Sequence, residues 1–249
     1  MDLSIFSRNN IGFVTLDDKY LPTAIVLPFE GNARQSKVIH AQAGLDGSRR
    51  IKLWTQLIRQ KISNQSRVLS ILGLDGAEKV ASYTALSEES VDFNEALAAK
   101  YYFEYYHDGL NRRSDDPVNS RLNYGYAILR SYIARTLVSA GFQPALGLHH
   151  SNQLNAFNLA DDLIEPYRAM VDLAVHNNLK SNTILSKTER HELTQILYNA
   201  CISNGAKVSI MTSIDVLIES LKRYVLCETD EELKLPVVLP IERMEGITE

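Results

Sequence analysis

The sequence predicts an α+β protein in which a short, incomplete N-terminal β portion precedes a large all-α domain. Three observations support this fold class. Two stretches rich in β-forming residues lie near the N-terminus, apolar residues recur at helical spacing through most of the remaining chain, and 45% of the 249 residues are hydrophobic. That fraction is enough for a substantial core. We expect a β portion with its linker at residues 1–33, a helical domain at 34–226 and an acidic C-terminal tail at 227–249.

The N-terminal β portion is predicted from two short runs. Residues 11–16 and 23–28 are rich in β-formers, and Asp17-Asp18 between them marks a turn. Two strands alone rarely make a stable unit. From Gly31-Asn32 onward the pattern becomes helical and predicts helices near 34–43, 48–72, 76–86, 92–107, 117–141, 157–178, 186–203 and 209–226.

Two of these helices begin with a capping-box spacing. Ser186 stands three residues before Glu189, and Asp92 stands three residues before Glu95. In the helix predicted at 92–107, Glu95 shares a face with alanine and tyrosine side chains that otherwise look inward. A carboxylate in that position needs a hydrogen-bond partner or a cation.

Charge is distributed unevenly along the chain, whose formal net charge is -4. Residues 34–67 contain eight basic side chains and one acidic side chain, whereas residues 228–249 contain seven acidic and two basic side chains. The basic segment is able to follow a phosphate backbone, although a solvated helix face is the commoner explanation for such a run. Trp54 lies within it at helical spacing with apolar residues, which favours a core position over base stacking.

The cysteines and the apolar runs of the sequence indicate the cellular compartment in which the protein works. Cys201 and Cys227 are too few and too isolated for a disulfide framework or a cysteine-rich zinc site, so we expect a reducing cytoplasm. No apolar run approaches the ~20 residues of a membrane span. The first residues also lack the basic start and long apolar core of a signal peptide. We expect a cytoplasmic protein with no membrane partner.

Histidine and acidic residues gather between residues 149 and 168. The segment holds two adjacent imidazoles, three acids and one arginine, interrupted by asparagines and a glutamine: His149, His150, Asp161, Asp162, Glu165 and Arg168. Nitrogen and hard carboxylate oxygens suit Mg²⁺ or Mn²⁺ better than structural zinc. Acids also complement a helix N-terminus, and a histidine pair in a loop is often only hydrogen-bonded, so this segment alone leaves both explanations open.

Four segments resemble one family, the CRISPR adaptation integrases. These are the universal CRISPR-associated endonucleases that insert new spacers, and the likeness is greatest to the form found with single-effector type II systems. The match spans roughly residues 10–225. It is carried by Leu21–Pro28 with the following Gly-Asn-Ala-Arg-Gln, Asn94–Phe103, Leu122–Arg130, and the stretch from Gly147-Leu-His-His to Asp162-Leu-Ile-Glu-Pro-Tyr-Arg168.

The resemblance implies a metal site in the helical catalytic domain. The family's ligand positions correspond to Glu95, His150 and Glu165, with Asp162 as a further ligand or supporting acid. Helical periodicity does not separate Asp162 from Asp161. Tyr124 matches an active-site tyrosine position in relatives, where it would orient phosphate or hydroxyl, and a core position is an equal alternative for Tyr124 and Tyr126. The implied cofactor is Mg²⁺ or Mn²⁺.

The implied reaction is a transesterification in which a 3′-hydroxyl of captured DNA attacks a phosphodiester at the edge of a CRISPR repeat. With water in place of the hydroxyl, the same site is a nuclease. Relatives bind duplex DNA through backbone contacts, so the likeness turns six basic residues into candidate phosphate contacts. They are Arg34, Arg49, Arg50, Arg59, Lys61 and Arg168.

The resemblance also implies protein partners and leaves rival functions open. Relatives are homodimers that work with the small second adaptation protein, and the single large effector nuclease is a candidate further partner. Relatives begin with a larger β domain, and the first residue of this chain corresponds to a position inside that domain, so we expect a truncated N-terminus. A truncated chain would be a catalytically impaired DNA-binding scaffold. A third reading is an unrelated helical metallohydrolase of small phosphate esters.

Overall fold

The computed structural model describes residues 4–9, 11–16, 22–26, 35–107, 112, 114, 116–176 and 185–244. Arg34 and the turn expected at Asp17-Asp18 lie outside these residues. The α-helices are α1 (Ser4–Arg8), α2 (Gln35–Ala43), α3 (Gly47–Leu72), α4 (Ala77–Ala81), α5 (Val91–Tyr106), α6 (Pro117–Ser139), α7 (Asn158–Leu163), α8 (Arg168–His176), α9 (Lys187–Thr194) and α10 (Ile210–Val225). Short 3-10 turns are η1 (Ser82–Thr84), η2 (Glu165–Tyr167) and η3 (Gln195–Tyr198).

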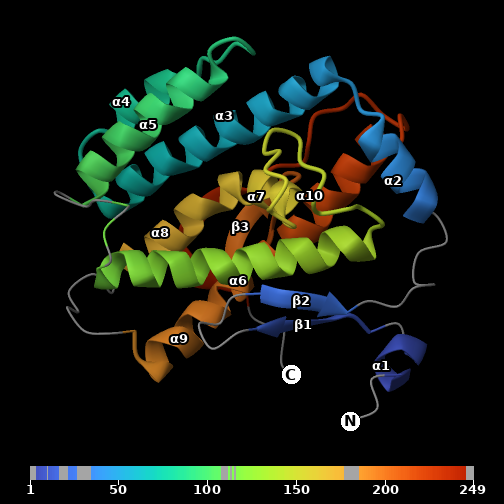
Figure 1. Ribbon diagram of the computed structural model, residues 1–249. Coiled ribbons are helices and arrows are strands. Elements are labelled where there is room, and N and C mark those ends of the chain that lie inside the picture. Colours follow the sequence, from blue (N-terminus) through green and yellow to red (C-terminus); the bar gives the residue numbers. More distant parts are fainter. Residues whose placement is uncertain are drawn as a thin grey trace.

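The long helix α3 is the central element of the helical body. Its N-cap Asp46 accepts a hydrogen bond from the Arg49 amide, and Gly73 ends the helix at a φ of 67°. α4 and α5 pack along one side of α3, while α8 packs against both α3 and α6 and the turn η2 packs against α3 (Figure 1). Side chains from α3, α5, α6, α8 and α10 form the apolar core.

The predicted N-terminal strands are confirmed as an antiparallel hairpin. β1 (Phe13–Leu16) pairs with β2 (Pro22–Val26), with Phe13 opposite Val26. Both strands contact α6, so the hairpin rests on the helical body (Figure 1).

The prediction that residues 34–226 are all helical is wrong in one region. The helix expected at 186–203 ends early, and β3 (Asn199–Ser203) follows as the middle strand of an antiparallel sheet. Its neighbours are β4 (Ala206–Ser209) and β5 (Val237–Arg243), and β5 comes from the predicted acidic tail. The physical reason lies in a two-residue turn: Asn204 and Gly205 have φ of 49° and 78°, as a tight hairpin requires.

A second predicted helix, at 157–178, is interrupted. α7 ends at Leu163, the single turn η2 contains Pro166, and α8 begins at Arg168. Proline has no amide hydrogen to donate, so the regular helical bonding pattern is broken here. Asp162 and Glu165 therefore belong to different helical segments, although they are three residues apart.

Candidate active site

Two glutamates from distant parts of the chain converge on one lysine. Glu95 lies on α5 and Glu165 on η2, and Lys61 of α3 lies between them. Lys61 Nζ is 2.5 Å from Glu95 Oε1 and 2.6 Å from Glu165 Oε2. The lysine side chain is only 9% exposed. The Glu95 carboxylate, which was expected to need a hydrogen-bond partner or a cation, is therefore paired with a buried ammonium.

Arg168 adds a second cation to Glu165. Its Nε lies 2.8 Å from Glu165 Oε1, on the side opposite the lysine contact. Burial alone would raise the pKa of the Glu165 carboxyl, but the charges of Arg168 and Lys61 outweigh it and hold that pKa at about 2. Burial would lower the pKa of Lys61, and the two glutamates raise it instead. Glu165, Lys61 and Arg168 are therefore charged near neutral pH.

His150 is held by Asp162 in a tight turn before α7. The imidazole Nδ1 lies 2.6 Å from Asp162 Oδ1, and this carboxylate also accepts hydrogen bonds from the backbone amides of Leu148, His149 and His150. The hydrogen bond to Asp162 raises the pKa of His150. With Nδ1 directed at the carboxylate, Nε2 is the ring nitrogen that a metal would use. Asp162 is thus a supporting residue that orients the imidazole.

Trp54 braces the same turn from α3. Its side chain is 2% exposed, so the predicted core position is confirmed. The indole stacks on His149 with ring centroids 4.2 Å apart, and its Nε1 donates to Asp92 Oδ1 at 3.0 Å. Asp92 is therefore not the helix cap that its spacing predicted, since α5 begins one residue earlier, at Val91.

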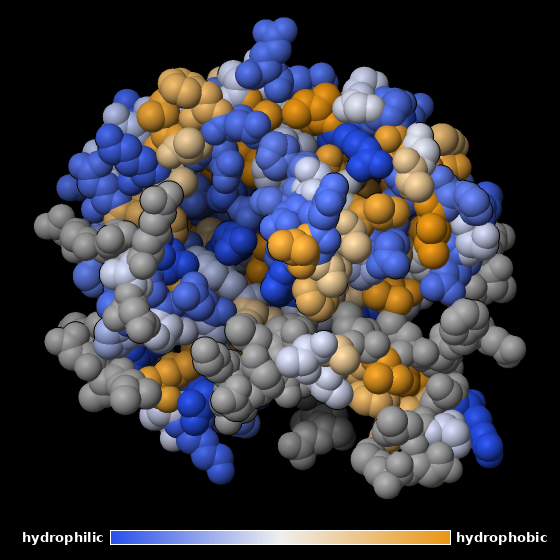
Figure 2. All heavy atoms as spheres, in the orientation of Figure 1, coloured by the Kyte–Doolittle hydropathy of each residue, from blue (hydrophilic) through white to orange (hydrophobic). Residues whose placement is uncertain are grey.

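A pocket of about 260 Å³ opens beside the glutamates. Three cationic side chains, Lys61, Arg112 and Arg168, line it together with Glu165, Tyr126 and Asp172. Figure 2 shows a hollow over α8, between α5 and α6, with mostly hydrophilic walls. A concave site with several cations and few acids suits a phosphate group.

Tyr126 contacts two of these cations. The Arg112 and Arg168 guanidiniums lie 5.6 Å and 4.9 Å from its ring centroid, and its hydroxyl donates to the buried carboxylate of Asp172. Tyr102 donates to the same carboxylate at 2.9 Å. Tyr126, Arg112 and Asp172 were missed from the sequence. A signal existed for Tyr126 only, because it stands two residues after the predicted Tyr124.

Tyr124 itself is partly buried against the apolar core. It is not among the residues that line the 260 Å³ pocket, whereas Tyr126 is. Its predicted role in orienting phosphate or hydroxyl stays a prediction. Asp161, the other acid that spacing left open, forms an ion pair with Arg130 at 2.7 Å, so Asp162 is the acid that holds His150.

The predicted metal ligands come together only in part. Within the described part of the chain, no three histidine, cysteine or acidic side chains form a group able to hold a metal ion. Glu95 and Glu165 meet, but His150 is turned toward Asp162. The two glutamates still fit a hard cation, because Glu165 Oε2 is buried and its ionic contact with Lys61 lacks hydrogen-bond geometry.

The other basic candidates differ in their surroundings. Arg49 donates to the Tyr224 carbonyl at 2.5 Å, and Arg50 donates to the carbonyls of Gly147, Leu45 and Gln42. Arg59 makes only long contacts, of 3.3 Å and 3.4 Å, with two carbonyls. Arg49 and Arg50 thus already have structural roles, and their contact with phosphate stays a prediction.

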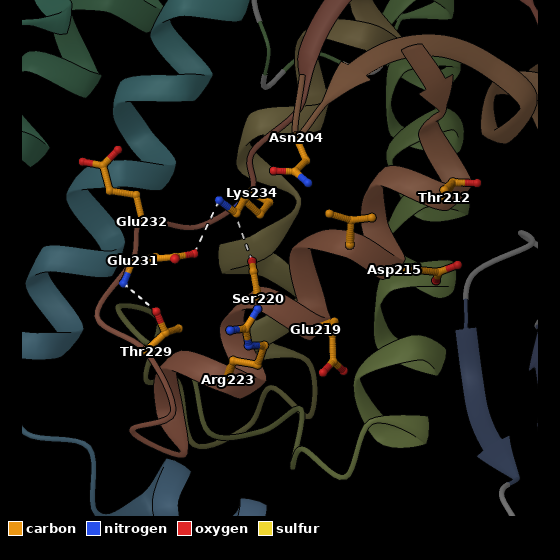
Figure 3. Close-up of a pocket in the computed structure, with 11 residues that line it drawn as sticks. Asn204, Thr212, Asp215, Glu219, Ser220, Arg223, Thr229, Glu231, Glu232 and Lys234 are labelled. Carbon is orange, nitrogen blue, oxygen red and sulfur yellow. Dashed lines mark hydrogen bonds and ion pairs between the residues drawn. The ribbon is translucent and has the colours of Figure 1, made fainter. Parts of the chain in front are cut away.

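A larger pocket, of about 390 Å³, lies elsewhere in the fold (Figure 3). Asp215, Glu219 and Arg223 of α10 face it from one side, and Glu231 and Lys234 approach from the following segment. It shares no lining residue with the pocket beside the glutamates.

None of the helices in the described part of the chain has the length and apolar character of a membrane span.

Solved structures share this fold. A casposase bound to integration product superposes with a TM-score of 0.70 and 20% identity, covering 92% of this chain and 80% of that chain. A Cas6-RT-Cas1–Cas2 complex gives a TM-score of 0.68 with 18% identity, over 92% of this chain and 30% of that chain. At these identities the likeness shows the fold alone.

The sequence comparisons show the family. The CRISPR-associated endonuclease Cas1 of Neisseria meningitidis serogroup C (strain 8013) is 34% identical over 246 residues, which are 96% of this chain and 81% of the relative. A Cas1 endonuclease of Francisella tularensis subsp. novicida (strain U112) is 32% identical over 161 residues, 61% of this chain and 48% of the relative. The family model described as CRISPR associated protein Cas1 matches residues 3–200. The chain that carries this cluster of two glutamates, a lysine and an arginine therefore belongs to the Cas1 family.

Proposed function

We propose that this chain is a metal-dependent DNA endonuclease and integrase of CRISPR adaptation. The observation that carries the proposal is the convergence of the partly exposed Glu95 and the buried Glu165 on Lys61, beside a pocket lined by Lys61, Arg112 and Arg168. Carboxylates suit a hard divalent cation, and the cations suit a DNA phosphate. The names of the relatives, which are CRISPR-associated endonucleases, support the same assignment.

In the proposed reaction, a 3′-hydroxyl oxygen attacks a phosphodiester in line. A new phosphorus–oxygen bond forms, the bond to the original 3′-oxygen breaks, and the attacking hydroxyl's proton is released as the leaving oxygen takes one up. Water in place of the hydroxyl gives hydrolysis. No covalent intermediate with the protein is required.

The residues around the pocket have distinct roles in this scheme. Glu95, Glu165 and His150 would hold Mg²⁺ or Mn²⁺, which supplies Lewis acidity and lowers the pKa of the attacking hydroxyl. Asp162 fixes the ring orientation of His150. Arg168 and Arg112, spaced by the Tyr126 ring, bind the nonbridging phosphate oxygens and stabilise the charge that develops on them.

The proposed partners are duplex DNA, as captured fragment and as repeat, a second copy of this chain, and the small second adaptation protein. The structural neighbours support two of these, since one is a casposase bound to integration product and another is a complex that contains Cas2. Arg59, Arg112 and Arg168 are the arginines proposed to contact DNA phosphate. Arg112 and Arg168 line the pocket, and Arg59 makes a long, exposed hydrogen bond.

The test is strand transfer of a labelled duplex into a repeat-containing target in Mn²⁺. Glu95→Ala, His150→Ala and Glu165→Ala should each reduce the rate by at least about 100-fold, because each removes a group acting on the transition state. Glu104→Ala, an exposed carboxylate on the same helix as Glu95, is the matched control and should keep the native rate. Circular dichroism should show unchanged helix content in all four variants.

Normal strand transfer by any two of the three variants would overturn the site assignment. If the chain is instead a DNA-binding scaffold, the His150→Ala protein should process branched or duplex DNA in Mn²⁺ as the native protein does. Absence of duplex binding in a filter assay at low salt would point to a hydrolase of small phosphate esters.

A further inference from the structure

We propose that Lys61 is an internal counter-cation, whose ammonium occupies the position of the divalent ion between Glu95 and Glu165 and is displaced when that ion binds. The inference rests on the proposed function, because it assumes that these glutamates are metal ligands. Its first support is geometric: Nζ lies within 2.6 Å of one oxygen of each carboxylate. A small cation that bridged those oxygens would occupy the same space.

The electrostatics explain why the protein needs such a group. Glu165 is 5% exposed, and two carboxylates meeting in a largely buried site repel each other strongly. One ammonium between them offsets this repulsion and lets the fold form without metal. Arg168 is already engaged with the other oxygen of Glu165, so it does not replace Lys61 at Oε2.

The contact between Lys61 and Glu165 is also of a kind that a metal ion is able to displace. Glu165 Oε2 is held by an ionic contact of 2.6 Å with the Lys61 ammonium. A lysine is a flexible point charge, in contrast to the planar fork of arginine. The displaced ammonium has a destination, because Lys61 also lines the 260 Å³ pocket in which the phosphate would bind.

The consequence is a competition between ammonium and divalent ion for the same two carboxylates. Native affinity for Mn²⁺ is then lower than the glutamates alone would give, and removing the ammonium should raise it. A lysine with a purely structural role would give the opposite result, since its loss would disorder the glutamates and weaken metal binding.

The experiment is Mn²⁺ binding by isothermal titration calorimetry to the full chain, without DNA. Lys61→Met, which keeps the length of the side chain and removes the charge, should bind Mn²⁺ at least tenfold more tightly than the native protein. Lys61→Arg should bind no more tightly than native. Lys52→Met, an exposed lysine on the same helix, is the matched control and should bind as native does.

Thermal unfolding gives a second measurement on the same proteins. Without metal, Lys61→Met should melt below native because the two carboxylates are left facing each other, and Mn²⁺ should raise its melting temperature by more than it raises that of the native protein. Mn²⁺ affinity in Lys61→Met equal to or below native overturns the inference.

Two outcomes separate this inference from the proposed function. If no variant binds Mn²⁺ and the native protein transfers no strands, both fail. If the native protein transfers strands but Lys61→Met gains no affinity, the inference alone fails. For a Lys61→Met protein that does not fold, a crystal structure of native protein with Mn²⁺ decides. The inference holds if Lys61 Nζ lies beyond hydrogen-bonding distance of the Glu95 and Glu165 carboxylates in that structure. It is overturned if an ion is bound and Nζ still bridges the two carboxylates.

Discussion

Glu95 and Lys61 are 34 residues apart in the sequence and 2.5 Å apart in the fold. The sequence showed that Glu95, on an inward-looking face, needed a partner or a cation. It did not identify that partner, because the pairing depends on how α5 packs against α3. Lys61 was predicted as a phosphate contact because it lies in the basic segment and relatives bind duplex DNA through backbone contacts. Its burial requires a counter-charge within the protein, which the two glutamates provide, and its contact with phosphate stays a prediction.

Asp172 is the other buried acid beside the pocket. Its carboxylate accepts from Tyr102 and Tyr126, and no lysine or arginine makes a direct ion pair with it among the residues given a structure. Burial raises its pKa to about 6, against the lowering effects of both tyrosine hydroxyls and of the charges on Arg112 and Arg168. The native protein therefore retains the Asp172 proton to a higher pH than the unfolded chain does.

This difference predicts how stability varies with pH. An acid whose pKa is raised on folding stabilises the native state below its unfolded pKa, and that contribution is lost as pH rises toward 6. The Asp172→Asn variant has no such titration. Its free energy of unfolding, minus that of the native protein, should therefore rise between pH 4 and 7 by up to about 3 kcal/mol and then level off. Urea denaturation at each pH measures this difference, and a difference that is flat across the range would contradict the prediction.

At the scale of single elements, the turn from Gly147 to His150 determines where the imidazole lies. A Cβ at Gly147 would lie 2.2 Å from the carbonyl oxygen of His150 and 2.8 Å from Asp162 Oδ2. Arg50 donates to the Gly147 carbonyl at 2.6 Å and ties the turn to α3. The turn therefore closes only when this position has no side chain.

We predict that Gly147→Ala opens the turn and displaces His150 from Asp162. Backbone must move to relieve a 2.2 Å contact, so the free energy of unfolding should fall by about 1–3 kcal/mol, and strand transfer should fall at least tenfold. Gly47→Ala is the matched control, because no atom lies within 4 Å of a Cβ there and the residue opens α3. It should leave both quantities near native values. Equal behaviour of the two variants would show that the turn is not so constrained.

The elements show which features a sequence pattern is able to predict. Long amphipathic runs predicted α3, α5, α6 and α10 to within a few residues, and the Ser186–Glu189 capping box at the start of α9 is confirmed. The hairpin at Asn204-Gly205 was missed because a helical pattern was extended into β3, although that dipeptide is a strong turn signal. An uninterrupted helix over the predicted range 157–178 would place Asp162 and Glu165, three residues apart, on one face. The turn containing Pro166 separates them, so that Asp162 contacts His150 and Glu165 contacts Lys61.

For the whole molecule, net charge is a poor guide to nucleic-acid binding. The chain carries a formal charge of -4, yet Lys61, Arg112 and Arg168 come from three separate segments to line one pocket. A concave surface bounded by low-dielectric protein focuses the field of such charges. Tertiary structure creates this concentration of charge, and among the described basic residues of the segment 34–67 only Lys61 lines the pocket.

This arrangement predicts the salt dependence of DNA binding. Each phosphate contact that releases a counterion steepens the plot of log affinity against log salt by about 0.9. Arg112→Gln and Arg168→Gln should each weaken binding to duplex DNA, measured in EDTA by fluorescence anisotropy, and should reduce the slope by about one. Lys207→Gln is the control, because Lys207 is already paired with Glu242 at 2.6 Å on the small sheet. Native slopes in both arginine variants would show that the pocket does not hold a DNA phosphate when metal is absent.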